Sequence, residues 1–279
     1  MNINVKKRNN RLVPFEVEKI NRSAERACQN LENVSASEIV LDAKIKLYDK
    51  VKTSEIDKSL ISSASSKIEK DPSYNYVAAR LLLNTIYKEV FGESVYSESF
   101  ELQYHKSFIV NLKKLVKEGI LDQKLTEEFD LKKLSEAIDT NRDLKWKYLG
   151  IQTIYDRYLL HIDGRRMESP QGFFMRVAMG LALAEKENKE DWAIKFYNTL
   201  SSFDLMSSTP TLFNSGTVHP QLSSCYLNTF EDSIDGIFDG LWQEARKSKF
   251  AGGLGMDITP YRGRGSYIKG TNGENQGPV

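Results

Sequence analysis

Short apolar patterns at the N-terminus predict two strands followed by a helix. Residues 3–5 and 12–15 carry closely spaced apolar side chains, and the polar run 6–10 between them ends in Asn-Asn, which suits a tight turn. From Val17 to Leu31 apolar residues recur every three or four positions, as they do along the buried face of a helix. The chain is therefore expected to begin with a β-hairpin and then to enter a helix.

Helix-start signals predict three further helices in the next segment. Residues 35–38, Ser-Ala-Ser-Glu, match a capping box, which predicts a helix that continues to about residue 50. Thr53, with an acidic residue in the following turn, is the expected N-cap of another helix. Apolar spacing over about 74–88 predicts a fourth helix. A hairpin with four helices makes a compact unit, which we place at residues 1–92.

The middle of the chain, 93–205, is expected to be mostly helical. Its Lys- and Glu-rich stretches contain helical apolar stripes, and Asp163-Gly164 is a strong signal for a β-hairpin turn. A further helix is expected after Pro170. The arginines of this segment could bind phosphate or form surface ion pairs, and we favour ion pairs. These arginines are Arg165, Arg166 and Arg176.

The segment 206–279 carries the residues with the most distinctive chemistry. Cys225 lies in a run of strand-forming residues, 222–227, where a cysteine is usually a small buried hydrophobe. The hydroxyl cluster 207–211 before it can bind a polar ligand or simply build a turn. Asp232 lies at the expected start of a helix. Its side chain could cap that helix, contact a ligand or do both. Glycine-rich stretches with fixed cations follow over 251–273, and such stretches suit phosphate oxygens.

Composition narrows the function classes. The chain has 279 residues, of which 40% are hydrophobic and 28% charged, as in an ordinary globular protein. A net charge of +1 argues against a general nucleic-acid-binding scaffold, and no apolar run is long enough to cross a membrane. The histidines lack metal-ligand spacing, so we expect no metal site. No P-loop pattern occurs, which disfavours a P-loop NTPase.

Four C-terminal segments together resemble a known enzyme family. In order they read STPTLFNSG, SSCYL, DSIDGIFDGL and AGGLGMDITPYRGRGSYIKGTNG. In this order and spacing they resemble the large (alpha) subunit of class I, Ia-type, ribonucleoside-diphosphate reductase. The resemblance implies that this part supplies the first strands of a ten-stranded α/β barrel.

The resemblance also implies roles for individual residues. Cys225 matches one of a redox cysteine pair that reduces a ribonucleoside diphosphate by a radical mechanism, and Thr209 and Ser224 match positions that touch the substrate. Other positions match the site where a deoxynucleoside triphosphate (dNTP) effector selects the substrate. They are Asp232, Ser233, Ile234, Lys249, Arg262, Lys269 and Gly270.

Three N-terminal segments resemble the ATP-cone domain, which senses ATP against dATP in many ribonucleotide reductases. They read VKKRNNRLVPFEVEKI, KTSEID and YNYVAARLLLNTIYKEV. Positions within its nucleotide-contacting stretches are Lys7, Arg8, Glu16, Lys19, Thr53, Asp57 and Lys88. Lysines could neutralise triphosphate oxygens, although each could equally be a solvated surface residue. The expected fold is thus an α+β ATP-cone, then helices, then an incomplete α/β barrel.

The family's chemistry needs more residues than this chain contains. Its mechanism requires further cysteines, including a radical-carrying one, yet the sequence has only Cys28 and Cys225. A barrel also needs its strands closed into a ring. We therefore expect a tightly associated C-terminal fragment of the alpha subunit, as a split gene would provide; an intein-interrupted precursor or a truncated chain are the alternatives.

Other expected partners follow from the resemblance. A di-iron small (beta) subunit would supply the radical, thioredoxin or glutaredoxin would be the external reductant, and the alpha chains would form a homo-oligomer. We expect no nucleic acid, no membrane and a cytoplasmic location, since two distant cysteines fit a reducing compartment. The competing hypothesis is a non-catalytic nucleotide-sensing regulatory module.

Overall fold

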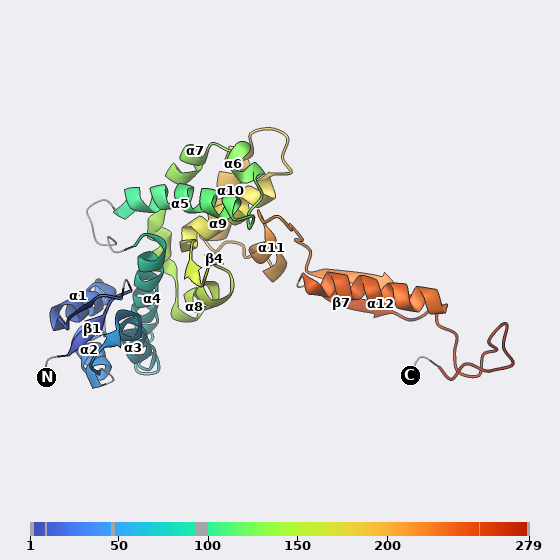
Figure 1. The fold of residues 1–279 in the computed structure, drawn as a ribbon, viewed down its shortest axis with the longest axis horizontal. Coiled ribbons are helices and arrows are strands. Elements are labelled where there is room, and N and C mark those ends of the chain that lie inside the picture. Colours follow the sequence, from blue (N-terminus) through green and yellow to red (C-terminus); the bar gives the residue numbers. More distant parts are fainter. Residues whose placement is uncertain (1–2, 9, 46–47, 93–99, 251, 278–279) are drawn as a thin grey trace.

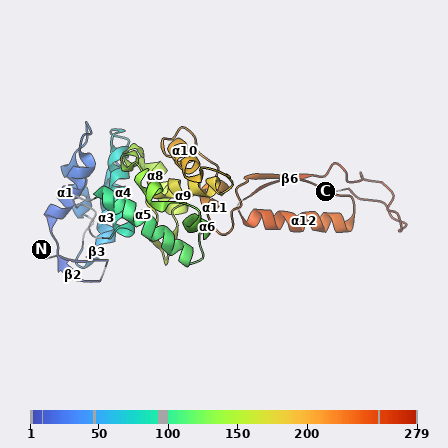
Figure 2. The ribbon, with the colours of Figure 1, turned by 90° about the horizontal axis from the view of Figure 1, so that it is seen from above.

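The chain forms three successive parts. The computed structural model describes residues 3–8, 10–45, 48–92, 100–250 and 252–277. A small α+β unit at the N-terminus leads into a helical body, and a slender strand–helix–strand unit projects from the far side of that body (Figure 1). The view from above shows the same arrangement (Figure 2). This order agrees with the expected fold class: a cone-like unit, helices and the start of a barrel.

The N-terminal unit packs helices against a small three-stranded sheet. Strand β1 pairs antiparallel with β2 and parallel with β3. The elements are β1 (Asn4–Lys6), β2 (Leu12–Pro14), α1 (Val17–Cys28), α2 (Ala36–Ile45), β3 (Val51–Lys52), α3 (Thr53–Ser65) and α4 (Tyr74–Val90). The hairpin and all four helices were predicted. Asn9, in the expected turn, lies outside the described residues.

Strand β3 was not predicted, and it shortens the second helix. That helix was expected to reach about residue 50, but α2 ends at Ile45. Lys50 adopts a left-handed backbone with φ of 62°, and Val51 then pairs with Val5 of β1. Val51 is 1% exposed, so burial of this side chain in the sheet stabilises the strand. A helix through residue 50 would forgo that pairing.

The two expected helix caps are only partly confirmed. The Ser35 hydroxyl accepts the Glu38 backbone N–H at 3.3 Å, as a capping box requires. The Glu38 carboxylate, however, pairs with Lys70 at 3.1 Å, and the Ser35 N–H donates to the Tyr74 hydroxyl. Thr53 is not the N-cap of α3 but its first helical residue, and the cap position makes no side-chain hydrogen bond.

The helical body surrounds α9, a helix in which all residues but Gly180 and Leu181 are buried. Its elements are α5 (Phe100–Lys117), α6 (Lys124–Glu127), α7 (Leu131–Glu136), the 3-10 helix η1 (Thr140–Lys145), α8 (Tyr148–Arg157), β4 (His161–Ile162), β5 (Arg165–Arg166), α9 (Pro170–Ala182), α10 (Lys189–Ser201) and α11 (Thr209–Asn214). The predicted hairpin is confirmed: Asp163 and Gly164 both have positive φ in the turn between β4 and β5. Ser169 caps α9 by accepting the Gly172 N–H, and Pro170 begins the helix.

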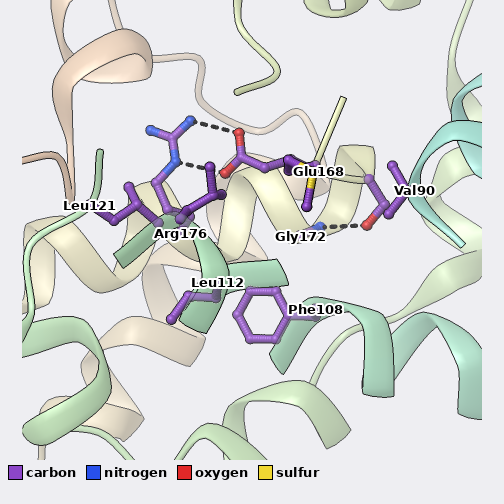
Figure 3. A pocket seen from close by; sticks show the side chains of 10 residues that line it. Val90, Phe108, Leu112, Leu121, Glu168, Gly172 and Arg176 are labelled. Atoms are coloured by element: carbon purple, nitrogen blue, oxygen red, sulfur yellow. Dashed lines mark hydrogen bonds and ion pairs between the residues drawn. The ribbon is translucent and has the colours of Figure 1, made fainter. Parts of the chain in front are cut away.

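Among the residues that the structure describes, none of the three arginines of this body forms a surface ion pair, so that expectation was wrong. Arg176 is 1% exposed, and its Nε lies 2.9 Å from the Glu168 carboxylate in a buried ion pair (Figure 3). Arg165 donates to the Glu89 carbonyl oxygen, and Arg166 donates to that of Tyr155. A buried cation is stable only when it is paired with an opposite charge. The start of α9 brings Glu168, which lies just before the helix, to Arg176.

A buried carboxylate fastens α4 of the N-terminal unit to the helical body. Asp143 of η1 accepts hydrogen bonds from the hydroxyls of Tyr87 (2.6 Å) and Tyr104 (2.9 Å) and from Gln171 (2.8 Å). These partners come from α4, α5 and α9. Burial raises the pKa of Asp143 to about 6, and the three donors oppose that rise.

The C-terminal unit is a single parallel strand–helix–strand repeat. Strand β6 (Cys225–Thr229) pairs in parallel with β7 (Gly253–Asp257), and α12 (Ile234–Lys249) lies alongside both strands (Figures 1 and 2). The observed strand begins at Cys225, three residues later than the start of the predicted run. Parallel pairing requires a crossover, and α12 provides it.

Much of the apolar surface of this unit is exposed. Its exposed large side chains are Leu227, Ile234, Phe238, Leu241, Trp242, Leu254, Met256, Ile258 and Tyr267. A parallel pair of strands normally has both faces covered. The unit therefore has the structure expected for the start of a barrel that other residues complete.

Candidate nucleotide and redox sites

The expected ATP-cone residues gather around one hollow between β1, β2, α1, α3 and α4. A cavity of about 170 Å³ is lined by Lys7, Glu16, Lys19, Thr53, Asp57 and Lys88, together with apolar residues such as Val5 and Ile20. Arg8 lines a more open hollow of about 570 Å³, which shares several of these residues. Residues that are far apart in the sequence thus meet at one place.

Two acidic residues hold cations around the cavity. The Asp57 carboxylate lies 2.8 Å from Lys88 Nζ and 3.4 Å from the Arg8 guanidinium. Glu16 lies 2.8 Å from Lys19 Nζ, and this partner lowers the pKa of the Glu16 carboxyl below its ordinary value. The hollow therefore presents positive side chains whose positions are set by carboxylates.

The N-terminus of α3 also faces this cavity. Thr53 is the first residue of that helix, and its side chain lines the cavity. Free backbone N–H groups and the helix dipole make the start of a helix favourable for an anion. Cations, a helix start and an apolar lining at one cavity together suit a nucleotide: phosphates near the charges and a base against apolar side chains.

Two arginines near this hollow were missed from the sequence. Arg22 and Arg26 of α1 line the larger hollow beside Lys19. Their spacing contained the signal, because Lys19, Arg22 and Arg26 follow one another at intervals of three and four residues on one face of a helix.

Cys225 has an exposed thiol at the start of β6. The adjacent Ser224 hydroxyl lies 3.7 Å from its Sγ, and Gly253 of β7 pairs with it across the sheet. The default expectation of a buried cysteine therefore does not apply here. An accessible thiol can reach a substrate or a second thiol.

Thr209 lies on α11, which is tied to the segment that leads to Cys225. The Thr211 hydroxyl donates to the Leu222 carbonyl oxygen at 3.1 Å, and the Asn214 amide donates to that of Gln221 at 2.8 Å. These contacts hold α11 near the approach to β6. Thr209 itself bonds to Tyr158, whose hydroxyl lies 3.0 Å from Thr209 Oγ1.

The expected effector residues are divided between the two ends of α12 and a loop. Ser233, not Asp232, caps α12: its hydroxyl accepts the Gly236 N–H at 3.0 Å. Of the two roles left open for Asp232, that of N-cap is therefore wrong. Its carboxylate instead lies 2.6 Å from the Nε of Arg262, in an ion pair.

The other effector positions lie elsewhere. Ile234 is the exposed first residue of α12, whereas Lys249 is its last, so the length of the helix, about 24 Å at 1.5 Å per residue, separates them. Lys269 and Gly270 lie at the tip of a loop closed by the bridge between Tyr267 and Glu274. One chain brings together Asp232, Ser233, Ile234 and Arg262, but not Lys249.

One cavity of the helical body is too small for a small-molecule ligand, and no metal-binding cluster is found among the described residues. The cavity beside Glu168 and Arg176 measures about 10 Å³, which is about the space of one water molecule (Figure 3). Within residues 3–8, 10–45, 48–92, 100–250 and 252–277 no group of three or more His, Cys, Asp or Glu side chains could hold a metal ion. None of the helices described there is long and apolar enough to cross a bilayer.

Comparison with known proteins identifies each part of the chain. Residues 3–89 match the model of the ATP cone domain, residues 144–220 that of the ribonucleotide reductase all-alpha domain, and residues 223–279 that of the ribonucleotide reductase barrel domain. The matches follow the order of the cone-like unit, the helical body and the strand–helix–strand unit.

Individual relatives agree with these matches. The chain is 46% identical over 258 residues to the ribonucleoside-diphosphate reductase subunit alpha of Chlamydia trachomatis, covering 91% of this chain and 24% of that protein. It is 40% identical over 279 residues to the subunit alpha of Helicobacter pylori, covering 99% and 34%, respectively. It is 36% identical over 269 residues to the large subunit of Danio rerio, covering 94% and 32%. The chain spans about a quarter to a third of the length of these relatives, and it belongs to the ribonucleotide reductase large-subunit family, of which it represents the N-terminal portion.

Proposed function

We propose that this chain is the N-terminal part of a ribonucleoside-diphosphate reductase alpha subunit that reduces ribonucleoside diphosphates to deoxyribonucleoside diphosphates. The observation that carries the proposal is the exposed Cys225 thiol at the start of the first barrel strand. There it would supply reducing equivalents together with a second cysteine of the complete protein, forming a disulfide in each turnover. Thr209 and Ser224 would touch the substrate.

The complete enzyme would need components beyond this chain. A di-iron small subunit would supply the radical, and thioredoxin or glutaredoxin would reduce the disulfide. A C-terminal part of the alpha subunit would close the barrel and cover the apolar surface of β6 and β7. We place the enzyme in the cytoplasm, where its free thiols would remain reduced. Functional boundaries at 1–92, 93–205 and 206–279 are part of this proposal.

A homo-oligomer of alpha chains is part of the same proposal. Effector positions lie at both ends of α12, about 24 Å apart by helix geometry. A compact dNTP site that uses both ends must therefore take Lys249 from one chain and Asp232 from another. The exposed apolar stripe of α12, which includes Phe238 and Trp242, supports such a contact.

The redox role is tested in the assembled enzyme. Cys225→Ser should abolish multiple-turnover reduction of CDP while leaving effector binding unchanged, because serine cannot form the disulfide. Cys28→Ser is the matched control: its thiol is half-buried in the N-terminal unit, and reduction should persist. Continued turnover of Cys225→Ser would refute the role.

The N-terminal cavity is proposed to bind ATP and dATP. Lys88→Ala should weaken ATP binding by about tenfold or more, because it removes a charge-assisted contact of ~1.5–3 kcal/mol. Lys106→Ala, an exposed lysine on α5, should leave the affinity unchanged. Equal ATP affinities for both variants and the wild type, measured by calorimetry, would contradict the assignment.

A regulatory module without catalysis is the second candidate. One observation favours it: the cavity of the N-terminal unit is complete within this chain, whereas the reducing chemistry needs further cysteines. Under this hypothesis ATP would bind with normal affinity, and Cys225→Ser would change no measured property. CDP reduction by the assembled wild type would exclude it.

A further inference from the structure

Tyr158 makes a buried contact with the proposed substrate-binding threonine. It follows α8 directly and is 9% exposed, and its ring packs against Phe213 of α11 with centroids 4.7 Å apart. Its hydroxyl lies 3.0 Å from Thr209 Oγ1, the first residue of α11. The ring packing therefore sets the position of the phenol oxygen, and the phenol oxygen meets the threonine hydroxyl.

The chemistry of the two hydroxyls assigns their roles. A phenol is far more acidic than an alcohol, so it is the better donor of the pair. Its buried O–H also requires an acceptor, and Thr209 Oγ1 is the one that the structure provides. With Tyr158 donating, the Thr209 proton is available to another acceptor. Thr209 is only partly buried, so that acceptor can come from a ligand.

We propose that Tyr158 is a positioning residue for the substrate: it donates to Thr209 Oγ1 and directs the Thr209 O–H toward an acceptor oxygen of the bound nucleotide. This inference rests on the function proposed above. The contacts of Thr211 and Asn214 with residues 221 and 222 extend the effect, because they tie α11 to the segment that enters β6. Tyr158 thus orients the substrate contact without touching the substrate.

The test is steady-state CDP reduction by the assembled enzyme that carries Tyr158→Phe. This variant keeps the ring against Phe213 and removes only the hydroxyl. The KM for CDP should rise about three- to tenfold, the effect of one net hydrogen bond, while kcat stays within about twofold. Tyr155→Phe is the matched control: Tyr155 lies on α8, one turn before Tyr158, and its hydroxyl donates to Glu89 instead. Its KM should equal that of the wild type.

A double-mutant cycle separates positioning from packing. Thr209→Val removes the other hydroxyl, and the Tyr158→Phe/Thr209→Val double variant should have the KM of Thr209→Val alone, because only one interaction is lost. The inference would be overturned if the double variant multiplied the KM increases of the two single variants. It would also be overturned if the KM of Tyr158→Phe were within twofold of the wild-type value. If the wild type reduces no CDP, the proposed function and this inference are both overturned. If the wild type is active but Tyr158→Phe does not raise the KM, only the inference about Tyr158 is overturned.

Thermal unfolding tests whether a change in KM merely reflects a loss of stability. Tyr158→Phe and Tyr155→Phe should unfold within a few degrees of the wild type, since each loses one hydroxyl. Should Tyr158→Phe unfold too early to assay under standard conditions, the same comparison is made at a lower temperature at which every variant is folded. A Tyr158→Phe KM within twofold of the wild-type value there would overturn the inference.

Discussion

The helical body and the C-terminal unit use the same kinds of apolar side chain in opposite ways. Phe173 and Phe174 of α9 are 0% exposed, whereas Phe238 of α12 is 67% exposed. Burying such a side chain contributes about 1.5–3 kcal/mol, so the body gains stability that the C-terminal unit lacks within this chain. In the body these side chains form a closed core, whereas in the C-terminal unit they are exposed to solvent.

The polar contacts show the same contrast. In the body, Arg176 is buried and bonded to Glu168 and to the carbonyl oxygens of Leu212 and Ser215. In the C-terminal unit, Arg262 and Asp232 are each about one-third exposed. A buried, multiply bonded charge locks neighbouring elements together, whereas an exposed pair contributes little. The body is thus a rigid base from which the C-terminal unit projects.

The largest expected effect comes from breaking the buried ion pair. Arg176→Ala should lower the free energy of unfolding by about 3–5 kcal/mol, because it leaves the Glu168 carboxylate buried and unpaired and frees α11. Lys133→Ala removes the exposed pair with Asp191 and should cost no more than about 1 kcal/mol. Urea unfolding measures both. Similar losses for the two variants would contradict the description of the body as the locked region.

The second effect is a pH dependence that the body alone should show. The pKa of Asp143 is raised from 3.8 to about 6 in the folded chain. Between about pH 4 and 6 the folded state therefore binds more protons than the unfolded state, so stability falls as pH rises. The penalty is on the order of 3 kcal/mol, is complete above about pH 6 and is absent below about pH 4.

Asp143→Asn isolates this effect. Other carboxyls, such as Glu16 and Glu38, have lowered pKa values and act in the opposite direction, so the comparison must be between variant and wild type. The stability difference between Asp143→Asn and the wild type should change by roughly 3 kcal/mol between pH 4 and 7. Urea unfolding at several pH values measures it. A constant difference would show that Asp143 titrates as an exposed carboxyl does.

A third effect compares two close-packed helical glycines. A Cβ on Gly180 of α9 would lie 2.2 Å from the backbone nitrogen of Gly216, whereas one on Gly240 of α12 would lie 2.7 Å from the Phe230 ring. Backbone in a packed core cannot move aside, whereas the Phe230 ring, although buried, can turn about its side-chain bonds. Gly180→Ala should therefore destabilise by about 1–3 kcal/mol, and Gly240→Ala should stay within about 1 kcal/mol of the wild type. Thermal unfolding of both variants decides, and equal costs would mean that α12 is packed as firmly as α9.

Local chemistry allowed part of this fold to be predicted from the sequence. The hairpin at Asp163-Gly164 and the start of α9 after Ser169 depend on residues a few positions apart, and both are as expected. Strand β3 was missed because it exists through the pairing of Val51 with Val5, which is remote in the sequence. Arg176 was assigned to the surface because its carbonyl partners, Leu212 in α11 and Ser215 directly after it, are remote in the sequence.

The candidate-site residues likewise depend on contacts that are remote in the sequence. Ser233 and Asp232 are both good N-caps by residue type, and the choice between them depends on Arg262, which attracts the Asp232 carboxylate. The residues of the N-terminal cavity were selected by resemblance, since nothing in local spacing brings Lys7 near Lys88. Their assembly depends on the tertiary packing of α1, α3 and α4 around the sheet.

The smallest effect on stability comes from the exposed stripe of α12. Phe238→Gln should change the free energy of unfolding of this chain by no more than about 0.5 kcal/mol, because the side chain is already largely in water. Phe174→Ala, in the body, should cost about 3–5 kcal/mol. Sedimentation of the assembled enzyme provides the complementary measurement: Phe238→Gln should weaken association of the alpha chains. A large loss of stability with unchanged association would mean that α12 already has its cover within this chain.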